Sequence, residues 1–291
     1  MNDRDPSFNF SHWLQNLVLS GLIGLALLVP YRWRVPVFGA LMQRIIAPVV
    51  GYRARALDNL ALIWPDMPLA RRRQIAARVA DNVGRTLIEN YSGKDFMARM
   101  ATIAPTGPGM AALRAAREKA QPAILVTGHF GNYEAARASL VAQGFSVGGL
   151  YREASNSYFN AHYVRTMEAF GGPVFAQGRR GTAGFVRHLR GGGQLVLLFD
   201  QDVRAAPAID FLGQPARTAT SAAELALRYG ALLIPFYATR GLDGISFDID
   251  LEAPIPASDA ATMTQAMSAS LERRVLAKPE QWFWIHRRWK K

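Results

Sequence analysis

Along most of the chain, short wholly apolar runs alternate with longer stretches in which apolar residues recur every three or four positions. The apolar runs are typical of strands buried on both faces of a parallel sheet, and they lie at 123–127, 147–151, 194–199 and 231–237. The longer stretches are typical of amphipathic helices, and they lie at 133–143, 157–170, 181–189 and 221–229. This alternation predicts an α/β fold with a mostly parallel central sheet flanked by helices.

Two further helices are predicted before the first strand. Residues 71–91 carry an apolar stripe from Ile75 to Ile88 with basic residues on the opposite face. A break rich in proline and glycine follows, and a second helix is predicted at 110–120. The chain contains no internal repeat, low-complexity tract or linker of interdomain type, so residues 32–291 are expected to form one domain.

The beginning of the chain has a different pattern. From Pro6 to Tyr31 there is no Asp, Glu, Lys or Arg. As a helix, the run Trp13–Pro30 would be about 27 Å long, close to the roughly 30 Å of a bilayer's hydrocarbon core. A cleaved signal peptide is disfavoured, because the residues before the run are net negative and no A-x-A site follows. We expect residues 1–31 to be a membrane anchor that spans the bilayer or lies in its interface; the alternative is a buried core helix.

Arginines alternate with aromatic and aliphatic residues immediately after this run. Such a composition is typical of a segment at the level of the lipid headgroups. We expect Tyr31 and Trp33 to be interfacial anchors and Arg32 and Arg34 to contact phosphates. By the positive-inside rule, this flank and the main domain are expected on the cytoplasmic side of the membrane.

Composition narrows the possible chemistry. The chain carries 34 basic and 22 acidic residues, a net charge of +12, and only five of the basic residues are lysines. A chain this basic is expected to meet an anionic partner, and arginine suits phosphate, although GC-rich coding also explains an arginine excess. The absence of cysteine excludes disulfides, thiolate zinc sites and a cysteine nucleophile.

The sharpest chemical feature is the sequence GHFGNYE at 128–134, directly after the first strand. Ligands of parallel α/β sheets bind at this edge, and the glycines permit a tight turn. Asn132 is placed to cap the next helix. His129 and Glu134 are five residues apart and are therefore expected at the same edge of the sheet. Glu134 is therefore expected to orient His129 as a general base acting directly on a substrate hydroxyl. The alternative is a buried structural histidine.

This motif resembles the H-x4-D/E motif of glycerolipid-type acyltransferases, and most of all that of the lipid A late acyltransferases. Four other stretches are similar to the same family and cover nearly the whole chain in order. They are Arg55 to Leu60 with Trp64-Pro65; Tyr151-Arg152 with Arg165 and Gly171; Asp200-Gln201 with Phe211-Leu212-Gly213; and the ending PEQWFWIHRRWK. Two positions depart from the family pattern, because Tyr133 replaces a common tryptophan and Ser157 a common proline.

The resemblance implies an enzyme on the cytoplasmic face of the cell inner membrane. Such enzymes transfer a fatty acyl chain from acyl carrier protein to a hydroxyl of a Kdo-bearing lipid A precursor, an anionic glycolipid. No cofactor is expected, and no metal site either, because ligand-type residues do not cluster at metal spacing. The residues expected to contribute to catalysis are His129, Glu134, Arg165 and Asp200. The residues expected to contact substrate are Asn132, Arg152 and Gln201.

Several alternatives share parts of this pattern. The same H-x4-E site would serve another membrane glycolipid or a lysophospholipid as acceptor, and a His–Glu pair could also activate water in a hydrolase. The net charge of +12 favours nucleic acid as well. No recognisable nucleic-acid-binding motif accompanies that charge, so no nucleic-acid partner is expected.

Overall fold

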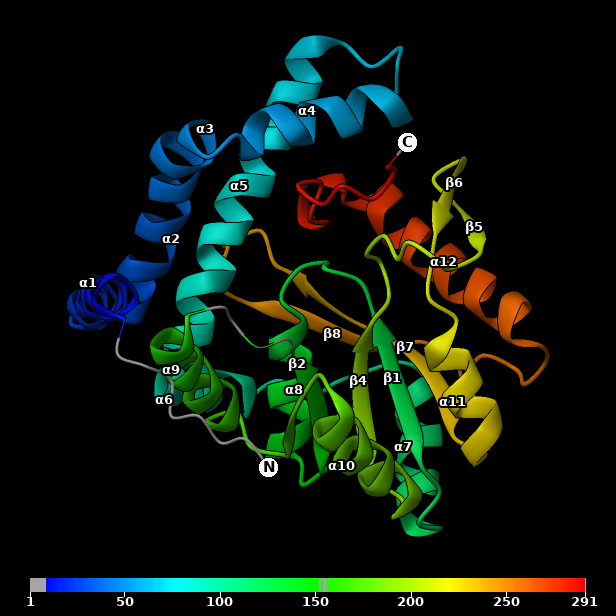
Figure 1. Ribbon diagram of the computed structural model, residues 1–291. Coiled ribbons are helices and arrows are strands. Elements are labelled where there is room, and N and C mark those ends of the chain that lie inside the picture. Colours follow the sequence, from blue (N-terminus) through cyan, green and yellow to red (C-terminus); the bar gives the residue numbers. More distant parts are fainter. Residues whose placement is uncertain (1–8, 152, 154–155, 291) are drawn as a thin grey trace.

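The computed structural model describes residues 9–151, 153 and 156–290 and shows an α/β protein (Figure 1). A six-stranded sheet in the order β3-β2-β4-β1-β7-β8 lies at its centre, and all neighbouring strands are parallel except β7 and β8. The strands are β1 (Ala123–Thr127), β2 (Val147–Tyr151), β3 (Val174–Ala176), β4 (Gln194–Leu198), β7 (Leu232–Arg240) and β8 (Phe247–Leu251). The predicted sheet is thereby confirmed.

The apolar runs located the interior strands but not the edges of the sheet. β1 and β2 have the predicted bounds, and β4 and β7 begin within about one residue of them. β3 was missed because it is only three half-buried residues long. β8 was missed because this antiparallel edge strand alternates between buried and more exposed positions, which an apolar-run criterion does not detect.

Helices cover both faces of the sheet. Ile124 and Val126 of β1 pack with one group of helices, while Ala123 and Leu125 point to the other side and pack with a second group. The first group is α10 (Arg179–Arg190), α11 (Ser221–Tyr229) and α12 (Ala260–Ala277), and the second is α6 (Gly93–Met100), α7 (Pro108–Glu118) and α8 (Tyr133–Ala142). The helices predicted from residue 71 onward lie within about two residues of their expected bounds, whereas α6 and α12 were not predicted.

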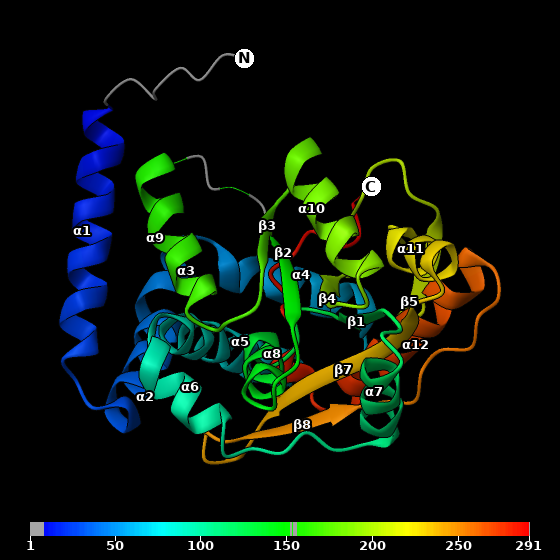
Figure 2. The same cartoon turned by 90° about the horizontal axis from the view of Figure 1, so that it is seen from below.

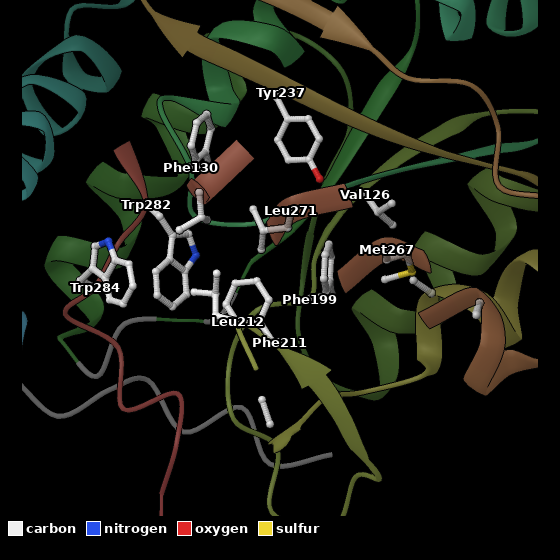
Figure 3. Packing of buried hydrophobic residues seen from close by; sticks show 14 of the residues in the cluster. Val126, Phe130, Phe199, Phe211, Leu212, Tyr237, Met267, Leu271, Trp282 and Trp284 are labelled. Atoms are coloured by element: carbon white, nitrogen blue, oxygen red, sulfur yellow. The ribbon is translucent and has the colours of Figure 1, made fainter. Parts of the chain in front are cut away.

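The carboxyl edge of the sheet is covered by segments from both ends of the chain (Figure 1). These segments are α4 (Tyr52–Ile63), α5 (Leu69–Tyr91) and a C-terminal segment that begins with the short 3-10 helix η2 (Pro279–Gln281). Trp282 and Trp284 of this segment are fully buried and contact each other. Trp282 also packs on Phe211, in the small hairpin of β5 (Ala208–Phe211) and β6 (Gln214–Arg217). Figure 3 shows these aromatic rings together with Phe130 and Leu271.

The amino-terminal apolar run forms α1 (Phe10–Leu27), and no residue of α1 is buried. This excludes the alternative of a buried core helix. By length and composition α1 could cross a membrane; so could the stretches Tyr31–Val49 and Tyr52–Ile63 taken as one span bent by 85°.

The segment after α1 differs in part from expectation. It continues as α2 (Tyr31–Leu41), the π-helix η1 (Met42–Ile46) and α3 (Ala47–Val49). Trp33 and Arg32 are exposed, as an interfacial role requires. Tyr31 and Arg34 are buried instead, because Arg34 pairs with Asp95 and lies 5.2 Å from the centre of the Tyr31 ring. Those two side chains therefore hold α2 on the domain, and the expectation that they face lipid is wrong.

Candidate active site

Two glycines in the turn after β1 lie close to neighbouring segments of the chain. A Cβ atom on Gly128 would lie 2.9 Å from the Asp200 Oδ2 and 2.5 Å from the Leu271 Cδ2. Gly131 has a φ of +56°, and a Cβ atom there would lie 1.9 Å from the Ala238 carbonyl oxygen. Gly131 is therefore required, because its φ is positive and a larger residue would meet main-chain atoms, whereas the neighbours of Gly128 are side chains.

His129 is held by Asp200. Asp200 lies two residues after the end of β4, the strand that neighbours β1 in the sheet. The His129 Nδ1 lies 2.7 Å from the Asp200 Oδ1, and the His129 main-chain N–H donates to Oδ2 at 2.7 Å. Trp282 Nε1–H donates to the same Oδ2 at 2.9 Å. The carboxylate is 1% exposed, while the His129 side chain is 23% exposed. Asp200 thus fixes the Nδ1–H tautomer and leaves the Nε2 lone pair for a ligand.

The electrostatics of this pair favour an ionised aspartate. Burial by itself would raise the pKa of Asp200, but the positive charge of His129 and the hydrogen bonds from its ring and main chain lower that pKa well below its usual range. The charge of a protonated His286 lowers it further. A carboxylate that stays charged at neutral pH stabilises the imidazolium that forms when His129 accepts a proton.

A second imidazole lies against His129. The ring centroids of His286 and His129 are 4.4 Å apart at an interplanar angle of 79°, and Phe283 contacts both rings. His286 Nε2 is buried and has no hydrogen-bond partner among the described residues. Burial and then the positive charge of His129 lower the pKa of His286 to about 4, so its ring is neutral at pH 7. The sequence pattern placed His286 in a structural or interfacial role and missed this contact.

Residues from three distant segments hold the C-terminal segment over the site. Asn59 Nδ2 donates to the carbonyl oxygens of Trp284 and His286 at 2.7 and 2.8 Å. Arg288 Nη1 donates to the carbonyl oxygens of Gln201 and Arg217 at 3.0 and 2.7 Å. Three of the stretches that carried the family resemblance therefore meet in space: the one with Asn59, the one with Gln201 and the motif PEQWFWIHRRWK, which was the sequence signal for this contact.

Glu134 does not occupy the position that was expected for it. Its Oε2 accepts a hydrogen bond from Arg137 Nη1 at 3.1 Å within the first turns of α8, and no hydrogen bond joins it to His129. Arg137 in turn donates to the carbonyl oxygens of Val147 and Gly171. The orienting role on His129 belongs to Asp200, because the adjacent parallel strand ends directly beside the loop whereas α8 turns Glu134 toward its own i+3 neighbour.

Asn132 caps α8, as expected, since its Oδ1 accepts the main-chain N–H of Glu134 at 3.1 Å. Its Nδ2 donates to Glu89 Oε2 at 3.0 Å, and Glu89 forms a buried ion pair with Arg240. Asn132 has no exposed surface and supports the loop, so the contact with substrate expected for its side chain is not available in this structure.

Gln201 and Arg165, two further expected site residues, have exposed side chains. Gln201 is exposed and is held through its main chain by Arg288. Arg165 is exposed on α9 (Ser157–Glu168) and forms no hydrogen bond with His129 or Asp200. Arg152 lies outside the described residues. Within the described part of the chain, no group of three or more His, Cys, Asp or Glu side chains could hold a metal ion.

Known proteins resemble this chain along nearly its whole length. The model of the bacterial lipid A biosynthesis acyltransferase family matches residues 3–291. The lipid A biosynthesis lauroyltransferase of Escherichia coli is 25% identical, with 96% of this chain and 92% of that protein covered. The myristoyltransferase of the same organism and the lipid A biosynthesis acyltransferase 1 of Shigella flexneri are each 24% identical, with 97% of this chain and 88% of each relative covered.

The family match includes every part of the site described above, from Asn59 through His129 and Asp200 to His286. It includes the amino-terminal helix as well. The chain therefore belongs to the bacterial lipid A biosynthesis acyltransferase family, and it is an acyltransferase.

Proposed function

We propose that this protein transfers a fatty acyl chain from the thioester of acyl carrier protein to a hydroxyl of a Kdo-bearing lipid A precursor. The observation that carries the proposal is the His129–Asp200 pair, joined at 2.7 Å at the carboxyl edge of a parallel sheet. An imidazole whose Nδ1 is held by a buried carboxylate is suited to take a proton from a hydroxyl at its other nitrogen, Nε2.

The names of the relatives support the class of acceptor and donor chain. They are lipid A lauroyl- and myristoyltransferases, so a saturated acyl chain of similar length is proposed for this enzyme. The net charge of +12 is favourable for binding both an acidic carrier protein and a phosphorylated glycolipid.

The reaction follows from the placement of the pair. The acceptor hydroxyl donates its proton to His129 Nε2 as its oxygen attacks the thioester carbonyl carbon, and the tetrahedral intermediate carries the charge on the former carbonyl oxygen. When the intermediate collapses, the carbon–sulfur bond breaks and the imidazolium returns the proton to the thiolate. Asp200 stabilises the imidazolium between these two events. Binding both substrates next to His129 supplies much of the rate through proximity.

The arginines outside the pair are proposed as contacts for anionic groups. Arg165 is exposed on α9, so we assign it to phosphates of the acceptor and not to the carbonyl oxygen. Arg152 and Gln201 follow β2 and β4 in the sequence and remain proposed substrate contacts.

We also propose that the enzyme works on the cytoplasmic face of the cell inner membrane, attached through residues 1–31. The exposed apolar side chains of α1 support this attachment. The exposed Arg32 beside Trp33 supports contact with anionic headgroups on that face.

The test is transfer of radiolabelled acyl chains from a panel of acyl carrier protein thioesters to a Kdo-bearing lipid A precursor. We expect transfer by the purified wild type and its loss in His129→Ala. Transfer only to another glycolipid or to a lysophospholipid would replace the acceptor. Equal transfer by His129→Ala would overturn the assignment of the base.

A further inference from the structure

Three of the five polar residues of the apolar helix α1 lie on one face of that helix, while Ser11 and Gln15 are exposed. The residues of α1 with the least exposed surface are spaced by four, four, three and three positions, which is the spacing of a single helical face. They are His12, Asn16, Ser20, Ile23 and Ala26. The three polar members of this stripe are thus turned away from the outer surface of the protein.

This stripe faces the domain. α1 packs along α9 and contacts α2, and Figure 2 shows α1 and α9 next to each other. The Asn156 Nδ2, at the start of α9, donates to the His12 carbonyl oxygen at 2.9 Å. α9 is a polar helix with exposed Arg165 and Glu168. A helix of this composition belongs in water or at headgroup level, because charged side chains in the hydrocarbon core are costly.

The opposite side of α1 is mainly apolar, and the same edge of the molecule continues along α2 and α3 (Figure 1). Exposure reaches 65% at Leu25 and 82% at Val49. We call this surface the apolar edge, and its large exposed residues are Phe10, Leu14, Leu17, Val18, Leu22, Leu25, Trp33, Val37, Ile45 and Val49. Single exposed apolar residues are ordinary, but a continuous set of this extent marks an interaction surface.

Arginines border the apolar edge. The Arg32 guanidinium lies 5.7 Å from the centre of the Trp33 ring. Arg44 and Arg53 line a groove of about 310 Å³ beside the exposed Ile45, and no ion pair joins either arginine to a carboxylate of the described residues. Cations without acidic partners beside an apolar surface are complementary to anionic lipid headgroups.

We propose that α1 lies flat in the interface of the bilayer, as one part of the apolar edge, and does not span the membrane. This inference rests on the membrane attachment proposed above and deepens it. A spanning α1 would have to leave α9 and expose His12, Asn16 and Ser20 to lipid, or take the charged α9 into the hydrocarbon core with it. A flat α1 keeps its polar stripe on the domain and its apolar face in the acyl region, with the arginines at the phosphates.

The absence of cysteine makes the test direct, because single cysteines can be introduced without removing native ones. Spin labels are placed in the full-length protein at Leu14→Cys, Leu17→Cys and Leu25→Cys on the outer face. Asn16→Cys and Ser20→Cys are the matched controls on the inner face. The depth of each label is measured in vesicles of phosphatidylethanolamine and phosphatidylglycerol.

We expect the three outer labels to lie at one similar, shallow depth and the two inner labels to be shielded from lipid-dissolved oxygen. A depth that rises to a maximum near the middle of α1 and falls again, with inner and outer labels alike, would overturn the proposal. Sidedness gives a second readout, in sealed inverted vesicles with an impermeant maleimide. Asn9→Cys, just before α1, and Leu242→Cys should react from the same side, and reaction from opposite sides would show a span.

Acyl transfer by the same vesicle samples separates this inference from the proposed reaction. Transfer with a spanning depth profile would retain the enzyme and overturn the flat helix. A flat profile without transfer would support the flat helix and count against the proposed substrates. Failure to bind the vesicles at all would overturn both the attachment and the flat helix, whatever the result of the transfer assay.

Discussion

The side chains of His129 and Asp200 meet at 2.7 Å although 71 positions separate them in the chain. The contact exists because β1 and β4 are neighbouring parallel strands, with Thr127 in register with Leu198. His129 lies two residues after Thr127, and Asp200 lies two residues after Leu198. The two side chains therefore lie at the same edge of the sheet. The role of Asp200 in the proposed reaction follows from this geometry, and it can be separated from that of Glu134.

Asp200→Asn is expected to lower kcat by roughly 10³- to 10⁴-fold, because an amide can accept from Nδ1–H but cannot stabilise the imidazolium. The measurement is acyl transfer at saturating donor and acceptor. Asp202→Asn is the matched control: Asp202 lies two residues away and pairs with Arg217 and Lys290, not with His129. That control should stay within about threefold of wild type. An Asp200→Asn enzyme of near-normal kcat would remove Asp200 from the mechanism.

Glu134→Gln is expected to affect stability more than chemistry. The substitution leaves the buried guanidinium of Arg137 without its carboxylate, and breaking a buried pair costs about 3 kcal/mol or more. Urea unfolding should show this loss, while kcat per folded molecule should fall at least tenfold less than in Asp200→Asn. An equal loss of kcat in the two variants, with normal stability of Glu134→Gln, would return Glu134 to the catalytic centre.

His286→Phe tests whether the unpaired Nε2 beside the base is used in the reaction. If its N–H supports an oxygen of the reacting groups, kcat should fall about 10²-fold with little change in KM, which is the usual cost of one such donor. His286→Gln should recover at least tenfold, because its amide can supply a similar N–H. Phe283→Leu reports on packing alone, since Phe283 contacts both imidazoles and has no polar side-chain atom. Equal losses in all three variants would indicate a packing role.

The buried His286 should make stability depend on pH between pH 7.5 and 5. Its pKa is about 4 in the folded protein and 6.5 when unfolded, so between these values the unfolded chain binds more protons and stability falls as the pH is lowered. From pH 7.5 to 5 this amounts to roughly 2 kcal/mol. Asp200 adds nothing in this window, because the stability due to its depressed pKa is lost only below the unfolded value of 3.8.

The measurement is the free energy of unfolding in urea at the two pH values, for wild type and for His286→Phe. The variant lacks the titrating group, so its loss between pH 7.5 and 5 should be smaller by about 2 kcal/mol. Identical losses in the two proteins would mean that His286 is protonated in the folded state at pH 5.

The ion pair of Glu89 and Arg240 is expected to hold the His129 loop through Asn132. Both side chains are buried, and Glu89 also accepts the Asn132 Nδ2–H. Arg240→Met leaves a buried carboxylate unpaired and should destabilise the protein by about 3–5 kcal/mol. The double variant Glu89→Leu/Arg240→Met should recover part of this loss, and unfolding in urea measures both. A double variant less stable than either single one would show that the charges themselves are favourable here.

Local pattern was sufficient for most of the regular structure. The strand Ala123–Thr127 and the helix Ser221–Tyr229 lie at their expected bounds, because short apolar runs and helical stripes depend on nearby residues only. The pattern of apolar residues did not predict elements whose formation depends on tertiary packing. The helix Ala260–Ala277 is rich in small and polar residues and has only a weak stripe, so it is a core helix mainly through the sheet face on which it packs.

For the site, the sequence by itself predicted the proposed base, His129, and the turn that presents it. The motif GHFGNYE contains His129, Gly131 with its positive φ and the Asn132 cap, and all of these are local properties. The partner of the base was decided by tertiary structure. Spacing within the motif favoured Glu134, but hydrogen-bond geometry depends on which strands are neighbours, and β1 and β4 are not consecutive in the chain. His286 and Trp282 come from the C-terminal segment laid over that edge, and only the folded arrangement of aromatic rings and carbonyl contacts places them on His129 and Asp200.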